Sequence, residues 1–228
     1  MTLHYRDDAL QADARAAAGL PGLTFSQRLY RQGIKRTLDV VLCLMMAPFV
    51  GLIVLVLALL VALDEGKPFY SQLRVGRNGR LYRMWKLRSM VTDADARLEA
   101  CLAACPDARA EWHSTQKLKN DPRITRLGQM LRRASLDELP QLWNVLRGDM
   151  SLVGPRPMMP EQRALYPGQA YYALRPGITG IWQVSQRNAS SFADRAVYDA
   201  RYHGQVSLGT DLRLLLATVR VVLRGTGY

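Results

Sequence analysis

Two adjacent carboxylates, Asp137 and Glu138, are the side chains of this sequence best suited to chemistry. Acids are scarce around them, because residues 64–228 carry 25 Lys or Arg side chains and only 15 Asp or Glu. A pair of carboxylates can hold Mg²⁺, and an ionised aspartate can attack phosphorus to give an acyl phosphate. The pair is therefore a candidate catalytic centre for phosphoryl transfer.

The local sequence predicts that this pair lies at the start of a helix. Ser135 and Glu138 have the spacing of a capping box, and Pro140 is comfortable only in a first helical turn, which predicts a helix beginning near Asp137. Free N–H groups at such a start favour ionised carboxylates and also bind phosphate. The same pattern is compatible with acids that only cap the helix.

Two short loops each present a single arginine. Gly154-Pro155-Arg156-Pro157 and Arg175-Pro176-Gly177-Ile178-Thr179-Gly180 are rich in Pro and Gly, so their backbones are restricted. A guanidinium on a rigid loop can hold phosphate through two parallel hydrogen bonds. Each loop taken alone is equally compatible with a turn that carries an ordinary surface arginine.

The whole chain of 228 residues has a net charge of +12 and 49% apolar residues. This apolar content, with only 22% charged residues, excludes a mostly disordered chain. A mean hydropathy of −0.09 excludes a protein with many membrane spans. The basic excess predicts an anionic partner, which can be nucleic acid, anionic lipid or a phosphorylated small molecule.

Residues 40–63 form a run of 24 residues without a charge. A straight helix of that length reaches about 36 Å, enough to cross a bilayer core of about 30 Å. Pro48 interrupts regular helix geometry, and a break there leaves arms of roughly 18 Å and 24 Å, each too short to span. Positive residues flank both ends, which suits two cytoplasmic ends. A helix hairpin and a kinked single span both remain open on these grounds.

The remaining patterns predict a mostly helical α+β fold with a small sheet. Residues 69–74 and 80–87 are typical of strands, and Asn78-Gly79 between them is a hairpin turn signal. Helical patterns cover residues 93–112, with an interruption at Pro106, and then 127–131, 139–146 and 212–223. We expect a mobile lead-in over residues 1–27, an interfacial and membrane-embedded helical segment over 28–65, and a further domain over 66–228 that carries the acidic pair.

Taken together, the motifs resemble those of the monotopic phosphoglycosyl transferases, bacterial enzymes that start polysaccharide assembly on polyprenyl phosphate. The resemblance runs from about residue 30 to residue 228 and rests on six ordered blocks, far more specific than any one of them. The blocks are Lys35-Arg36-Thr37-Leu38-Asp39, Trp85-Lys86-Leu87-Arg88-Ser89-Met90, Ser135-Leu136-Asp137-Glu138-Leu139-Pro140-Gln141-Leu142, Asn144-Val145-Leu146-Arg147-Gly148-Asp149-Met150-Ser151, Ser151-Leu152-Val153-Gly154-Pro155-Arg156-Pro157 and Arg175-Pro176-Gly177-Ile178-Thr179-Gly180.

The resemblance implies a re-entrant helix hairpin kinked at Pro48, with interfacial amphipathic helices and a catalytic domain on the cytoplasmic face of the bacterial inner membrane. It also implies Mg²⁺ as cofactor, with Asp137 as nucleophile on the sugar-bearing phosphate of a UDP-hexose and UMP as the product released. Polyprenyl phosphate then takes the phosphosugar. Glu138 helps to hold the metal or handles a proton. The matching phosphate contacts are Lys86, Arg132 and Arg156, and the nucleotide or sugar contacts are Arg175 and Arg187.

Two features bear on the sugar. Gln186 stands where the family commonly has Gly, which puts the loop conformation near Arg187 in doubt. The C-terminal residues Gly225-Thr226-Gly227-Tyr228 are similar to the ending of members that transfer galactose 1-phosphate or glucose 1-phosphate, so we expect one of these two sugars.

Two other classes of function compete with this interpretation. A membrane-anchored nucleic-acid-binding protein accounts for the charge and a non-catalytic scaffold for the apolar run, but neither needs an acidic pair. We expect anionic membrane lipid as a partner and no nucleic acid. The sequence leaves open whether the protein is a homo-oligomer.

Overall fold

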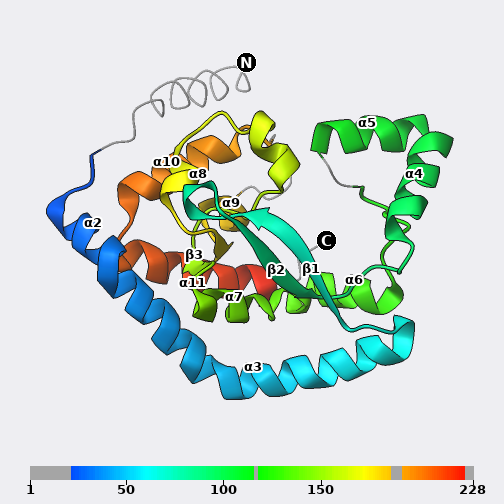
Figure 1. Ribbon diagram of the computed structural model, residues 1–228, viewed down its shortest axis with the longest axis horizontal. Coiled ribbons are helices and arrows are strands. Elements are labelled where there is room, and N and C mark those ends of the chain that lie inside the picture. The colour runs from blue at the N-terminus through cyan, green and yellow to red at the C-terminus, as the bar shows by residue number, and fades with distance from the viewer. Residues whose placement is uncertain (1–21, 116–117, 186–191, 224–228) are drawn as a thin grey trace. The chain divides into compact units, whose positions relative to one another are not determined.

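The computed structural model describes residues 22–115, 118–185 and 192–223. Within these ranges the chain is mostly helical, with two small two-stranded sheets (Figure 1). The predicted α+β class with a long apolar helix and a small sheet is confirmed. The elements in the second half of the chain are α7 (Gln141–Arg147), β3 (Ser151–Val153), η4 (Pro160–Leu165), α8 (Ala170–Ala173), β4 (Gly177–Thr179), α9 (Ile181–Ser185), α10 (Arg195–Gln205) and α11 (Leu208–Leu223).

The chain enters its long apolar helix through two short helical segments. α2 (Phe25–Leu29) begins inside the predicted lead-in and leads into the π-helix η1 (Tyr30–Ile34) and then α3 (Lys35–Glu65). The stretch Phe25–Asp64 is long and apolar enough to cross a membrane, and only 11% of its most apolar window is buried. The helix therefore differs from the core helix of a soluble domain, whose apolar side chains are mostly covered.

Pro48 lies inside α3, which is assigned as helical on both sides of the proline. Helices tolerate an internal proline when the freed backbone groups are satisfied by other means. The arrangement of the two arms as a re-entrant hairpin thus stays a prediction.

The β-hairpin predicted over residues 69–87 is confirmed. Its strands are β1 (Phe69–Val75) and β2 (Leu81–Leu87), which pair in one sheet (Figure 1). The turn between them is the short 3₁₀ segment η2 (Arg77–Gly79). Asn78 and Gly79 have φ of 58° and 76°. Asn and Gly tolerate this left-handed region better than other residues, so the Asn-Gly signal identified the turn for a physical reason.

Contacts divide the chain into two compact units. Unit 1 comprises Met1–Ala47, Gln72–Met84 and Gln141–Arg220, and unit 2 comprises Pro48–Ser71, Trp85–Pro140 and Val221–Tyr228. These contact-based units do not test the domain boundaries predicted at residues 27 and 65, which stay a prediction.

In unit 1 a parallel pair of short strands joins the two arginine loops. β3 pairs with β4 so that Ser151 lies opposite Gly177 and Val153 lies opposite Thr179. The pairing continues into the loops, because the Gly154 N–H donates to the Thr179 carbonyl and the Gly177 N–H donates to the Pro155 carbonyl, both at 2.8 Å. Two segments that the sequence presents separately are thereby parts of one structural element.

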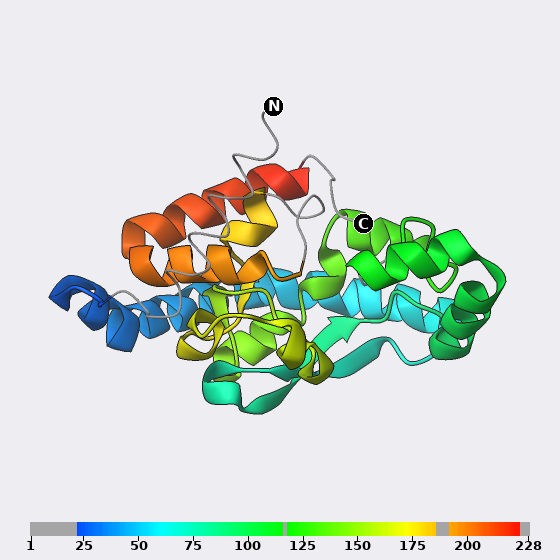
Figure 2. The same cartoon turned by 90° about the horizontal axis from the view of Figure 1, so that it is seen from above.

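A buried polar network in unit 1 ties the beginning of the long helix to α11. Lys35 Nζ lies 2.6 Å from Asp211 Oδ2, and the Tyr30 hydroxyl donates to the same oxygen at 2.7 Å. The Tyr202 hydroxyl of α10 donates to the other oxygen, Asp211 Oδ1, at 2.6 Å. α10 and α11 follow one another through a short connection at residues 206–207, as Figures 1 and 2 show. The buried carboxylate therefore has a cation and two hydroxyl donors, as a buried charge requires.

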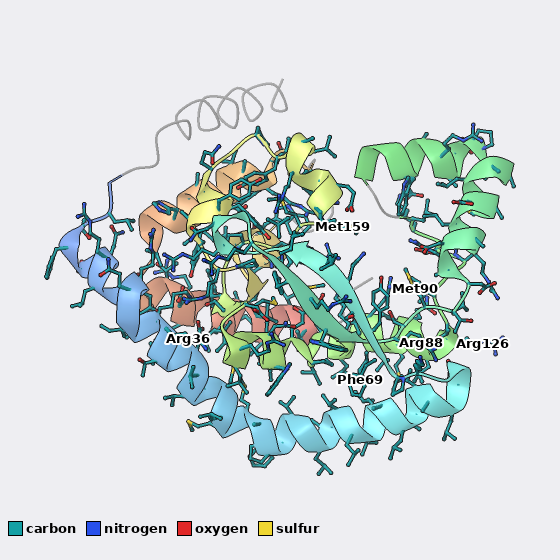
Figure 3. The ribbon with its side chains drawn as sticks, in the orientation of Figure 1. Arg36, Phe69, Arg88, Met90, Arg126 and Met159 are labelled. Atoms are coloured by element: carbon teal, nitrogen blue, oxygen red, sulfur yellow. The ribbon has the colours of Figure 1, made fainter. Side chains whose placement is uncertain are left out.

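The next residues of the same sequence block make further anchoring contacts within unit 1. Arg36 donates to the carbonyls of Val145 and Leu146 at the end of α7, and Figure 3 shows its side chain on the side of α3 that faces α7. Asp39 accepts the Leu152 N–H of β3 at 3.0 Å. The charged residues that precede the apolar run thus hold the start of α3 in a defined position.

Unit 2 has its own small core, which packs the apolar face of α6 (Arg126–Arg133) against the second half of α3 and the end of β2. Its buried members are Leu57, Ala58, Val61, Leu87 and Leu131. The helical pattern over residues 93–112 forms α4 (Ala94–Ala104) and α5 (Pro106–Thr115), so the interruption predicted at Pro106 is confirmed. The 3₁₀ segment η3 (Leu136–Glu138) follows α6.

We expect Gly154→Ala to destabilise the β3–β4 pair. A Cβ at residue 154 would lie 2.3 Å from the Arg175 carbonyl oxygen and 2.9 Å from the Gly177 nitrogen, both backbone atoms that cannot move independently. Overpacking of this kind lowers the free energy of unfolding by about 3 kcal/mol. Denaturant unfolding of the detergent-solubilised protein measures the change.

Gly209→Ala is the matched control, because a Cβ there meets nothing within 4 Å. Residue 209 lies in α11, where alanine is favoured over glycine by about 1 kcal/mol. The control should be as stable as the unmodified protein or slightly more so. Equal stability of the Gly154→Ala variant would show that the two loops are not packed as described.

Candidate functional site

The acidic pair lies in η3 rather than in the first turn of a long helix. Ser135 precedes η3 with φ 55° and ψ 24°, and its side chain makes no capping hydrogen bond. The predicted capping box is therefore wrong, because an N-cap residue needs extended backbone geometry and Ser135 is left-handed. Pro140 agrees with the revised boundary, since α7 begins only at Gln141. Ser135 reverses the chain between α6 and the acidic pair.

Among the described residues, Lys86 of β2 is the cation that lies within 4 Å of both carboxylates. Its Nζ lies 2.7 Å from Glu138 Oε1 and 3.6 Å from Asp137 Oδ2. The Asp137 side chain is 8% exposed, whereas those of Lys86 and Glu138 are each 22% exposed. All three residues belong to unit 2, and their side chains are in contact. That they act together in catalysis stays a prediction.

Burial raises the pKa of the Asp137 carboxyl above its usual value. Lys86 and Arg132 oppose the rise, while repulsion from the Glu138 carboxylate adds to it. A bound divalent cation would favour the ionised form in the same way as these two side chains. The positive charges beside the carboxylate therefore favour its ionised form.

Arg132 supplies further positive charge from the last turn of α6. Its Nε donates to the Ser89 hydroxyl at 2.8 Å. Burial lowers the pKa of Arg132, and the carboxylates of Asp137 and Asp121 counteract that effect. Ser89 was not among the predicted site residues, although it stands in the same sequence block as Lys86.

Two further predicted cations, Arg156 and Arg175, are in unit 1. The guanidinium of Arg156 lies over the ring of Trp182 at 5.5 Å, and that of Arg195 lies over the same ring at 4.4 Å. Arg175 donates its Nε to the Gly148 carbonyl at 3.0 Å. Arg187, together with the substitution at Gln186, lies outside the described residues. The sequence did not single out Trp182 or Arg195.

The carboxylate pair fits a magnesium ion. Among the described residues no group of three or more His, Cys, Asp or Glu side chains could hold a metal. Mg²⁺ does not need such a group, because proteins commonly bind it through one or two carboxylates while water and substrate phosphates complete the coordination. Asp137 and Glu138 both lie within 4 Å of one cation, Lys86 Nζ, so their oxygens can also share a metal ion.

A family model described as bacterial sugar transferase matches residues 30–225. The chain belongs to this family. The matched range contains all six sequence blocks, so the family assignment made from the motifs is confirmed.

Curated relatives extend this result. Over 196 residues the chain is 46% identical to a UDP-galactose-lipid carrier transferase of Erwinia amylovora, with 85% of this chain and 41% of that protein covered. It is 45% identical to an undecaprenyl-phosphate galactose phosphotransferase of Salmonella typhimurium, with 85% and 41% covered. The exopolysaccharide production protein ExoY of Rhizobium meliloti is 42% identical, with 85% of this chain and 87% of that protein covered.

This chain therefore spans 41% of the length of the Erwinia and Salmonella relatives and 87% of the Rhizobium relative. The matched part includes the acidic pair, its cations in unit 2 and the two arginine loops in unit 1.

Asp199 of α10 is a buried carboxyl group that interacts electrostatically with Arg195. The Tyr166 hydroxyl donates to Asp199 Oδ2 at 2.8 Å. Burial raises the pKa of Asp199 to about 7, although the hydrogen bond from Tyr166 and the charge of Arg195 lower it. The side chain therefore titrates near neutral pH in the folded protein.

The stability of the protein should depend on pH through Asp199. The folded state keeps a proton that the unfolded state loses above about pH 4, so the Asp199 contribution falls as pH rises from about 4 to 7 and is constant above. Asp199→Asn keeps an acceptor for Tyr166 and removes this titration. We expect the thermal midpoint of the variant, relative to the unmodified protein, to rise between pH 5 and 7.5. A difference independent of pH would contradict the prediction.

Proposed function

We propose that the protein transfers hexose 1-phosphate from a UDP-sugar to polyprenyl phosphate, as the initiating step of exopolysaccharide or other glycoconjugate assembly. The observation that carries this proposal is the carboxylate pair Asp137-Glu138, one member buried, held against Lys86 and beside Arg132. Membership of the bacterial sugar transferase family supports it. Phosphoryl transfer depends mainly on positioning and on neutralising phosphate charge, which such a basic site provides.

In the first step an Asp137 oxygen attacks the sugar-bearing phosphorus of the UDP-sugar. The bond that breaks joins that phosphorus to the oxygen bridging the two phosphates, and UMP leaves with the electron pair. The product on the enzyme is an acyl phosphate that carries the sugar. Lys86 and Arg132 balance the negative charge that gathers between the carboxylate and the diphosphate.

In the second step a phosphate oxygen of polyprenyl phosphate attacks the same phosphorus and displaces the Asp137 carboxylate, giving polyprenyl diphosphate sugar. Glu138 would hold Mg²⁺ together with Asp137, or handle a proton. The ion, when bound, would neutralise phosphate charge and orient the diphosphate. Lys86 lies between the two carboxylates and can pair with either as their charges change.

The remaining arginines of the motif blocks and Arg187 would bind other parts of the donor. Arg156 would contact phosphate, with its guanidinium backed by the Trp182 ring. Arg175 and Arg187 would contact the nucleotide or the sugar. In Arg175 the Nε is engaged by Gly148, and its other nitrogens would be the ones to reach a ligand.

The lipid acceptor implies a membrane location, which we propose to be the cytoplasmic face of the bacterial inner membrane. The exposed apolar side chains of α3 support insertion into lipid. α11 adds an exposed apolar stripe suited to the bilayer interface, consisting of Leu208, Leu212, Leu216 and Val219. With Pro48 in its middle, α3 would enter and leave the same leaflet, which places a lipid phosphate and a soluble nucleotide sugar at one level.

Two of the relatives have names that specify galactose. This supports UDP-galactose as the donor, in line with the expectation of UDP-galactose or UDP-glucose from the C-terminal sequence.

The central prediction is release of UMP that requires both a UDP-hexose and Mg²⁺. Purified protein is incubated with undecaprenyl phosphate and UDP-galactose, UDP-glucose or UDP-N-acetylglucosamine, and UMP and glycolipid are quantified. We expect the highest rate with UDP-galactose or UDP-glucose, loss of activity with EDTA, and recovery on adding Mg²⁺. Asp137→Asn should lower turnover at least a thousandfold, because the amide cannot act as the nucleophile.

Asp95→Asn, which changes an exposed acid in unit 2, is the matched control and should keep normal turnover. With UDP-galactose labelled at the sugar-bearing phosphate and no acceptor lipid, label should appear on the protein in a peptide that contains residue 137. Normal turnover by Asp137→Asn, or label on another residue, would show that Asp137 is not the nucleophile.

The hairpin is tested by Pro48→Ala, which restores the missing N–H and removes the ring clash. Single cysteines at Gln32 or Asp64 report on the two flanks, in a background without the native Cys43, Cys101 and Cys105. In the parent both positions should resist a membrane-impermeant thiol reagent added to intact spheroplasts. In Pro48→Ala a straight α3 can span, so one position should become reactive.

Gly51→Ala serves as the control, because it alters the same helix where a Cβ meets nothing within 4 Å and keeps the proline. It should leave both flanks protected. Protection of both flanks in Pro48→Ala as well would mean that the proline does not determine the topology.

A further inference from the structure

Ser89 and Arg132 form a contact within unit 2 that the proposed chemistry has not used. Ser89 is buried, with 6% of its surface exposed, and its hydroxyl accepts a hydrogen bond from Arg132 Nε at 2.8 Å. The two residues are 43 positions apart in the chain. Ser89 follows β2, and Arg132 lies in the last turn of α6.

The backbone of Ser89 also holds α6 at its other end. The Ser89 carbonyl accepts the Thr125 N–H at 3.2 Å, and Thr125 is the N-cap residue of α6. Between these two contacts Gly128 packs so closely that a Cβ would lie 2.0 Å from the Ser89 carbonyl oxygen. Figure 3 labels Arg88 and Met90, the neighbours of Ser89, close to Arg126 at the start of α6. Ser89 therefore contacts α6 at its N-cap, at Gly128 and at the guanidinium of Arg132.

The hydrogen bond to Ser89 uses one particular nitrogen of the guanidinium. Among the described residues no hydrogen bond is made by the two terminal nitrogens of Arg132. These nitrogens form a planar fork that matches the oxygens of a phosphate group. The guanidinium is also in electrostatic contact with Asp137, the proposed nucleophile. Because Nε is hydrogen-bonded to Ser89, the two terminal nitrogens are the part of the Arg132 guanidinium that can bind a ligand.

We propose that Ser89 is a positioning residue, whose hydroxyl holds Arg132 Nε so that the terminal nitrogens meet the diphosphate of the bound nucleotide sugar beside Asp137. This inference rests on the proposed function. Ser89 does not touch the substrate, and its effect passes entirely through Arg132. An arginine held at one end loses less conformational entropy when it binds phosphate, and a misplaced donor costs rate in a transfer that depends on positioning.

The test uses Ser89→Ala, Ser89→Thr, Arg132→Met and the double variant Ser89→Ala/Arg132→Met in the full-length, membrane-embedded protein. Ser89→Ala leaves the Thr125 bond and the Gly128 contact intact, since both involve only backbone atoms of residue 89. The steady-state rate of UMP release gives kcat/KM for the UDP-sugar, and thermal unfolding reports on the fold.

We expect Ser89→Ala to lower kcat/KM about tenfold or more, the usual size of the loss when a hydrogen bond to a charged group is removed. Ser89→Thr keeps the hydroxyl and should recover most of the activity. Added to Arg132→Met, Ser89→Ala should cause no further loss, because its target is gone. The matched control is Ser71→Ala in β1 of the same unit, whose hydroxyl makes no hydrogen bond to the described residues, and it should remain fully active.

The outcomes separate this inference from the proposed function. If the unmodified protein turns over but the Ser89→Ala and Arg132→Met losses multiply in the double variant, Ser89 does not act through Arg132 and the inference is overturned while the function stands. The same conclusion follows if Ser89→Ala is as active as Ser71→Ala. If the unmodified protein releases no UMP from any UDP-sugar, the proposed function fails and this inference fails with it.

Discussion

Two neighbouring carboxylates, one of them buried, repel one another, and the elements of unit 2 bring positive charge beside them. Asp137 and Glu138 share Lys86 Nζ at 3.6 and 2.7 Å. Their own helical turn carries no cation, so Lys86 comes from the end of β2 and Arg132 from the end of α6. Without these charges burial would raise the pKa of the Asp137 carboxyl further, and a protonated acid is a poor nucleophile.

The site depends on backbone contacts as much as on charge. The left-handed Ser135 turns the chain so that the acidic pair follows closely on Arg132. Ser89 and Gly128 bring α6 against the segment after β2 with no room for another carbon atom. Such contacts allow little adjustment, because backbone atoms cannot change rotamer. A small residue and a strained turn beside a charged pair are typical of sites where geometry matters more than stability.

In unit 1 a buried polar network holds the start of the apolar helix α3 in a defined position. Lys35 and Asp211 form a buried ion pair, and two tyrosine hydroxyls satisfy the carboxylate further. Removing one partner of such a pair typically costs about 3 to 5 kcal/mol, because the other charge stays buried alone. In the apolar part of α3 that follows, only 11% of the most apolar window is buried, and the buried residues Leu57, Ala58 and Val61 pack in the core of unit 2. The polar network thus fixes the start of a helix whose apolar surface is mostly uncovered by the described residues.

The sequence by itself determined the local elements and the family. The hairpin at Asn78-Gly79 and the break at Pro106 rest on backbone preferences of single residues, and the motif blocks rest on residue identity. It failed at Ser135, because tertiary contacts placed that residue in a left-handed turn that its type does not specify. Only the tertiary structure joined Ser89 to Arg132 and Lys35 to Asp211, pairs 43 and 176 positions apart. Such contacts depend on how whole helices and strands pack, and a local sequence pattern does not specify that packing.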